Sequence, residues 1–94
     1  MLNELRTLAL RFGNIPATPR QLKVVNSFIV TYCTDREERL LLLGHLFDRT
    51  LTTSKQLSMG EASAFIDLAF KAAWEPNPEF IIFLQQEKQS LYIF

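Results

Sequence analysis

The chain has 94 residues, 48% of them hydrophobic, which is enough for one domain whose core needs neither metals nor disulfides. Ten Lys/Arg balance ten Asp/Glu, and this excludes a polycation of the kind that binds nucleic acid indiscriminately. Cys33 is the only cysteine, which excludes an intramolecular disulfide and a thiolate metal site and favours a reducing compartment.

The start of the chain predicts a first helix over residues 2–12. Gly13 and then Pro16 end its pattern. The apolar residues recur at helical spacing, at Leu2, Leu5, Leu8, Ala9 and Phe12.

A second helix is predicted over residues 19–33. Thr18-Pro19-Arg20-Gln21 is a capping box with proline at the first helical position, where its fixed φ suits the turn. The apolar stripe that follows consists of Leu22, Val25, Phe28, Ile29 and Tyr32.

A third helix is predicted over residues 35–49, followed by a short turn at 54–57. Thr34 with Glu37 has the pattern of another capping box, and Asp35 lies where the helix dipole is positive. Residues 40–43, Leu46 and Phe47 make this helix apolar nearly all round, so we expect it at the centre of the core.

A fourth helix is predicted over residues 59–74. Ser58 and Glu61 form its capping box, and Asp67 and Lys71 are four apart and expected to pair. One helical face carries Ala62, Phe65, Ile66, Ala69, Phe70 and Ala73.

The last twenty residues allow two interpretations. Asn77-Pro78-Glu79 is a good helix start, and we favour a helix near 78–89 with an apolar tail. Residues 80–84 also suit a strand, with residues 91–94 as its hairpin partner. Either way the expected fold class is all-α, with four or five short helices around a single core. The chain is expected to be one domain, 1–94, with an apolar C-terminal extension at 75–94.

The chemistry-bearing residues do not indicate an enzyme. His45 shares a helical face with Glu38, Leu42 and Arg49, but a histidine on a packed helix is more often a boundary residue than a proton-transfer group. Cys33 has no obvious base nearby in the sequence and is interpreted as a small core or boundary residue. No metal-ligand spacing or phosphate-cradling glycine loop is present. We therefore expect no catalytic residue, no metal and no cofactor.

Nucleic-acid binding has more support. Residues 1–60 carry eight Lys/Arg against five Asp/Glu, whereas residues 61–94 carry two against five, which permits a basic face. Two helix starts place hydroxyls beside cations, an arrangement that suits a phosphate, although such hydroxyls are caps first. The candidate contacts to DNA or RNA are Arg20, Lys23 and Lys55, extended by Arg6 and Arg11.

The competing hypothesis is a protein-interaction adaptor or a homodimer. The C-terminal fifth is crowded with apolar residues, which must fold back onto the core or be buried in a partner. The candidate partner-binding residues are Trp74, Phe80, Phe83, Tyr92 and Phe94. No apolar run approaches the about 20 residues that span a membrane, and the first residues lack the layout of a signal peptide. We expect a cytoplasmic protein.

Residues 17–73 resemble a small helical module of phage and mobile-element proteins, the Mu-type GemA regulatory proteins and modules attached to phage recombination proteins. The matching stretches are Thr18-Pro19-Arg20-Gln21-Leu22-Lys23, Arg36-Glu37-Glu38-Arg39 and Thr53-Ser54-Lys55-Gln56-Leu57-Ser58, the last running into Glu61-Ala62-Ser63-Ala64-Phe65-Ile66-Asp67. The resemblance implies a helical fold and a regulatory role in replication, recombination or transcription control. It supplies no catalytic residue.

Overall fold

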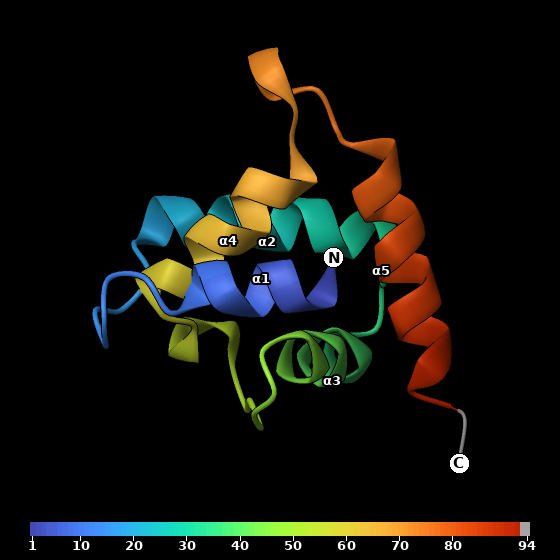
Figure 1. Cartoon of the computed structure of the whole chain (residues 1–94). Coiled ribbons are helices and arrows are strands. Elements are labelled where there is room, and N and C mark those ends of the chain that lie inside the picture. Colours follow the sequence, from blue (N-terminus) through green and yellow to red (C-terminus); the bar gives the residue numbers. More distant parts are fainter. Residues whose placement is uncertain (93–94) are drawn as a thin grey trace.

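The computed structural model describes residues 1–92, and their regular elements are all helical (Figure 1). The α-helices are α1 (Leu2–Ala9), α2 (Pro19–Tyr32), α3 (Arg36–Leu46), α4 (Met59–Ala69) and α5 (Pro78–Ser90), with 3-10 turns η1 (Ser54–Gln56) and η2 (Ala72–Trp74). Within residues 1–92, β-structure is limited to two isolated bridges, Pro16 with Ser58 and Phe70 with Pro76. The predicted all-α class is confirmed.

Side-chain caps explain where the helices begin. Thr18 Oγ1 accepts from the N–H of Gln21 at 3.1 Å and Gln21 Oε1 accepts from the N–H of Thr18 at 3.0 Å, which is the predicted capping box. Ser58 and Glu61 form the same pair of bonds at the start of α4.

The capping box predicted at Thr34 is wrong. Asp35 caps α3 instead, because the helix begins at Arg36 and the Asp35 carboxylate accepts from the N–H of Glu37 at 3.1 Å. The side chain that sequence analysis had placed near the dipole is therefore itself the cap.

The helix starts were predicted more accurately than the helix ends. The expected helix over residues 59–74 stops at Ala69, because Phe70 is extended and the backbone N–H of Asn77 donates to Ala69 O at 2.8 Å. Lys71 therefore lies beyond α4, and the expected pair with Asp67 does not form. Asp67 pairs instead with Arg11, with 2.8 Å between Oδ2 and Nη2.

The helices pack around a cluster of aromatic rings. α1 crosses α4, α2 lies against the other side of α4, and α5 runs along one end of the molecule, where it contacts α2, α3 and α4 (Figure 1). The rings of Phe65 and Phe80 are fully buried with centroids 5.0 Å apart, and Phe28 meets each of them edge-on at 5.8 Å. Such edge-to-face pairs contribute about 0.5–1.5 kcal/mol each beyond their buried area.

Gly60 allows α4 to start directly against the end of α1. A Cβ atom at this position would overlap the carbonyl oxygens of Ala9 and Arg11. Small buried residues, Ala62 and Ala64, continue along α4. The close approach of α1 and α4 thus depends on the absence of a side chain at Gly60 and on the small side chains that follow it.

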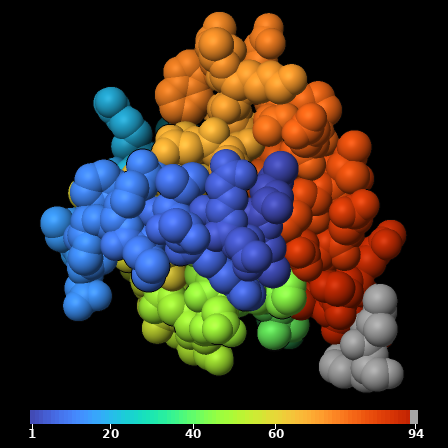
Figure 2. Space-filling view, viewed as in Figure 1, coloured from blue at the N-terminus to red at the C-terminus, as the bar shows by residue number. Residues whose placement is uncertain are grey.

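The C-terminal segment folds back onto the core as a helix, so the favoured interpretation is confirmed and the alternative strand over residues 80–84 is wrong. Residues 93 and 94 lie outside the described chain. The segment around residues 70–76 projects beyond the body of the molecule, at the top of Figure 2. Within residues 1–92, no helix combines the length and apolar character needed to cross a bilayer.

Candidate functional site

The ten Lys/Arg side chains fall into three groups according to their partners. Arg11, Arg49 and Lys88 pair with carboxylates. Arg6, Arg36 and Arg39 donate to backbone carbonyls. Four cations have neither an ion pair nor a side-chain hydrogen bond within residues 1–92, namely Arg20, Lys23, Lys55 and Lys71.

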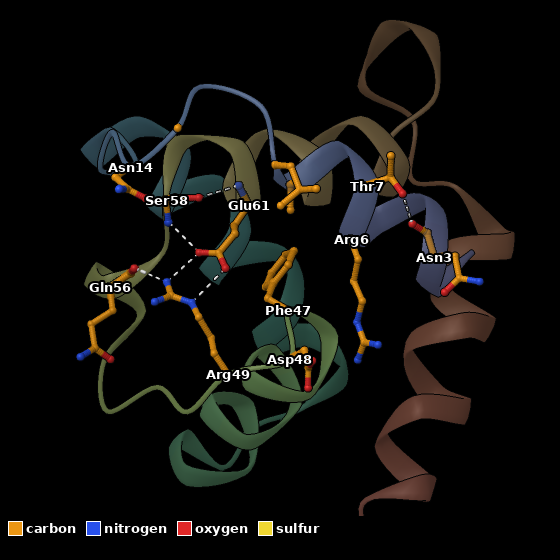
Figure 3. Close-up of a pocket in the computed structure, with 13 residues that line it drawn as sticks. Asn3, Arg6, Thr7, Asn14, Phe47, Asp48, Arg49, Gln56, Ser58 and Glu61 are labelled. Atoms are coloured by element: carbon orange, nitrogen blue, oxygen red, sulfur yellow. Dashed lines mark hydrogen bonds and ion pairs between the residues drawn. The ribbon is translucent and has the colours of Figure 1, made fainter.

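Arg49 and Glu61 form a structural junction beside a cavity of about 700 Å³ (Figure 3). The guanidinium approaches the carboxylate through two atoms, Nε at 2.9 Å and Nη2 at 2.7 Å, and it also donates to the carbonyl of Gln56. Glu61 accepts from the N–H of Ser58 as well and is 8% exposed. Both charges are therefore occupied in joining the end of α3 and η1 to the start of α4.

Arg6 and Arg11, two of the predicted phosphate contacts, have internal partners. Arg6 donates to the carbonyls of His45 at 2.8 Å and Leu46 at 3.1 Å in the last turn of α3, where the helix dipole favours a cation. Arg11 pairs with Asp67, and both side chains are exposed. The structure therefore separates these two arginines from the cations that have no partner.

Arg20, Lys23 and Lys55 lie on neighbouring elements. Arg20 and Lys23 are one turn apart on α2, and both are exposed. Lys55 is exposed on η1, which packs against α2 through a 3.2 Å hydrogen bond from Asn26 Nδ2 to Ser54 Oγ. The structure therefore places the two predicted basic helix starts on elements that contact each other.

His45 and Cys33 contribute to packing contacts between helices and to the buried core. His45 Nε2 lies 2.9 Å from Glu87 Oε2, a contact that joins α3 to α5. Cys33 is 1% exposed, and burial together with the nearby Glu38 carboxylate raises the pKa of the thiol. The raised pKa disfavours the reactive thiolate. Within residues 1–92, no three His, Cys, Asp or Glu side chains are grouped as a metal site would require.

The predicted partner-binding residues divide by burial. Phe80 is fully buried and Phe83 is 9% exposed, so their assignment to a partner surface is wrong, because both rings fill the core. Trp74 is 65% exposed and Tyr92 is 61% exposed. Phe94 lies outside the described residues.

Trp74 borders an apolar groove of about 550 Å³ between α2 and the 70–76 segment, which sequence analysis missed. Its ring lies edge-on to Phe70, with centroids 5.2 Å apart. Ala73 and Trp74 both adopt φ of 60°, an uncommon conformation for non-glycine residues. The groove is lined by Lys23, Val24, Ser27, Phe28, Thr31, Tyr32, Phe70, Trp74 and Pro76. No local pattern predicts it, because it forms between segments at least 38 positions apart in the numbering.

The candidate functional surfaces are therefore the unpaired cations of α2 and η1 and, beside them, the groove that contains Lys23. The function of these surfaces is inferred from the residues of this chain alone. In comparisons of sequence and structure, no protein-family model, no curated protein and no solved structure matches the chain.

Proposed function

We propose that this chain is a non-enzymatic accessory or regulatory module that binds the phosphate backbone of nucleic acid in the cytoplasm, in a process of phages or mobile elements. The observation that carries the proposal is that Arg20, Lys23 and Lys55 lie on adjoining elements without an internal partner among residues 1–92. The resemblance to GemA-type modules is a second, independent support.

Phosphate binding requires a positive charge that is not already neutralised within the protein. A cation whose charge is paired with a carboxylate must give up that pair before it can bind a phosphate, whereas an exposed, unpaired cation gives up only water and counterions. The neutral overall charge keeps non-specific attraction small, so binding depends on this local group.

The test is fluorescence anisotropy with labelled single- and double-stranded oligonucleotides between about 50 and 200 mM salt. We expect saturable binding that weakens steeply with salt. The slope of log K against log[salt] is expected to fall by about 0.7 per lost contact for single strands and about 0.9 for duplex when Arg20, Lys23 and Lys55 are changed to Gln.

Arg11→Gln is the matched control, because it removes one unit of charge from a cation already paired with Asp67. It is expected to change the slope less than any one of Arg20→Gln, Lys23→Gln and Lys55→Gln. Absence of binding at the lowest salt, or a triple variant with unchanged affinity for DNA and RNA, would remove the proposal.

A second function, association with a protein or with another copy of the chain, is favoured by the groove at Trp74. An exposed tryptophan beside an apolar groove is typical of the centre of an interface. Sedimentation over a range of concentrations tests the homodimer form of this hypothesis. A dimer that Trp74→Ser dissociates would support it, whereas a monomer at every concentration would exclude self-association.

A further inference from the structure

A small polar pocket lies where α2, the first turns of α3 and η1 meet. Its volume is about 230 Å³, the space of several water molecules at about 30 Å³ each. It is smaller than the roughly 300–1,000 Å³ pockets that enclose whole drug-sized ligands. Its lining residues are Asn26, Arg36, Arg39, Leu40, Leu43, Thr53 and Ser54. The pocket is therefore suited to one small polar group.

Two arginines are held at this pocket by backbone carbonyls. Arg39 Nη1 donates to the carbonyls of Cys33 at 3.2 Å and Thr34 at 2.5 Å, and Arg36 Nη2 donates to Thr52 O at 3.3 Å. A guanidinium has five N–H donors. These bonds use one nitrogen of each arginine, and within residues 1–92 the remaining guanidinium nitrogens have no hydrogen-bond partner. Both groups are thus positioned and keep donors to offer.

The two hydroxyls of the pocket also have protons to donate. Ser54 Oγ accepts from Asn26 Nδ2 at 3.2 Å, and Thr53 Oγ1 accepts from the N–H of Lys55 at 3.3 Å. A hydroxyl has one proton besides its acceptor lone pairs. Since internal donors already occupy an acceptor position on each oxygen, Thr53 and Ser54 are free to act as donors toward the pocket.

The lining has an excess of positive charge. None of its seven residues within the described chain is acidic. The carboxylate of Asp35 is bonded to the N–H of Glu37, and that of Glu38 pairs with Lys88 at 3.1 Å. Leu40 and Leu43 supply apolar walls, which reduce solvent screening of the arginines. A pocket with two cations and several donors has the chemistry to bind an anion.

We propose that this pocket binds one phosphate group, with Arg36 and Arg39 as charged donors and Thr53 and Ser54 as hydroxyl donors. The inference rests on the proposed function for the source of the phosphate, a nucleic-acid strand whose neighbouring phosphates contact Lys55. Arg36 and Arg39 were not among the predicted contacts. Their role becomes apparent only when η1 is placed against the start of α3.

The first experiment titrates the whole chain with inorganic phosphate at constant ionic strength and follows ¹H–¹⁵N NMR signals. Saturable shifts are expected at the guanidinium Nε–H groups of Arg36 and Arg39 and at the amides of residues 53–55. Chloride added to the same ionic strength should not reproduce them. Shifts that stay linear, or that spread over every exposed lysine, would overturn the pocket as a specific site.

Variants then identify the donors. Arg36→Gln is expected to weaken phosphate binding about tenfold, and Ser54→Ala by a smaller factor, since a charged donor contributes more than a neutral one. Arg39 also holds Cys33 and Thr34, so Ser54→Ala provides the safer second test of the pocket. Arg11→Gln is the matched control, because Arg11 pairs with Asp67 outside the pocket, and it should leave phosphate binding unchanged. Equal loss in all three variants would overturn the assignment.

Oligonucleotides distinguish the source of the phosphate. If the pocket binds a backbone phosphate, strands with and without a 5′-phosphate should bind equally. If it binds a terminal phosphate, the 5′-phosphorylated strand should bind more tightly, and Arg36→Gln should abolish that difference in affinity. If inorganic phosphate binds here but no oligonucleotide does, the pocket stands and the nucleic-acid function fails. If oligonucleotides bind and neither Arg36→Gln nor Ser54→Ala weakens them, the function stands and the pocket is overturned.

Discussion

The junction of α1, α3 and α4 and the surface formed by α2 and η1 are both rich in basic residues, yet they use them in opposite ways. At the junction, Arg6 binds the carbonyls of His45 and Leu46. Arg49 binds the Glu61 carboxylate (Figure 3). On the other surface, Arg20, Lys23 and Lys55 have no partner within residues 1–92. Whether a basic residue of this protein is available to bind a ligand therefore depends on its internal hydrogen-bond and ion-pair partners.

The difference also separates stability from binding. Removal of a junction cation takes a charged donor away from part-buried acceptors, which lowers the free energy of unfolding. Removal of an exposed cation without a partner leaves no such group and should act on ligand affinity alone.

The largest effect is expected at Glu61. Glu61→Ala removes the carboxylate that binds Arg49 and the acceptor that completes the Ser58 capping box, and it should lower the free energy of unfolding by about 3 kcal/mol. Urea denaturation followed by circular dichroism measures the change. Glu79→Ala, at an exposed first-turn glutamate of α5, is the control and should cost at most about 0.5 kcal/mol. Equal losses in the two variants would break the comparison.

Arg6→Gln should have the next largest effect, about 1.5 kcal/mol of unfolding free energy, because the carbonyls of His45 and Leu46 lose charged donors. Thermal and urea unfolding measure the loss, with Arg20→Gln as the charge-matched control. Oligonucleotide affinity of the folded Arg6→Gln variant should be close to that of the parent. A stable variant with weakened binding would place Arg6 on the binding surface instead.

A third region with charged contacts lies where Glu38 of α3 meets Lys88 of α5 and Tyr92 just beyond it. A hydrogen bond with Glu38 raises the pKa of Tyr92 to about 12 from its ordinary value of 10.0, and bonds from Tyr92 and Lys88 lower the pKa of Glu38 below 4.5. The stabilisation from Tyr92 is therefore complete below pH 10 and is lost as pH rises through about 12. That from Glu38 is present above pH 4.5 and is lost as pH falls through the lowered pKa.

Phenolate absorbance in a Tyr32→Phe background follows Tyr92 alone. The midpoint is expected at about pH 12 and should move toward 10 in Glu38→Gln. Glu37→Gln is the control, because Glu37 is the exposed neighbour and is not among the causes of the Tyr92 shift. A midpoint that Glu38→Gln leaves in place would show that Glu38 does not act on the Tyr92 hydroxyl.

The smallest effect on stability is expected from the combined change of Arg20, Lys23 and Lys55 to Gln. The free energy of unfolding should stay within about 0.5 kcal/mol of the parent, because no internal acceptor within residues 1–92 loses a donor. Chemical denaturation of the triple variant checks this. A loss as large as that of Arg6→Gln would mean that these cations also support the fold.

The amino-acid sequence by itself determined the helix starts and the composition of the core. Thr18 with Gln21 and Ser58 with Glu61 act over three residues, so their capping bonds depend on local conformation alone. The helix ends were harder to predict. α4 ends where Asn77 reaches back to Ala69, and this contact spans eight positions and a change of chain direction.

Only the tertiary structure decided which charged residues have an internal hydrogen-bond or ion-pair partner. Arg6 finds its carbonyls 39 and 40 positions away, and Arg11 finds Asp67 56 positions away. The pocket of Arg36 and Arg39 likewise needs η1 beside the start of α3. The physical reason is that caps are satisfied within one turn of a helix, whereas the partner of a long cationic side chain depends on how the helices pack.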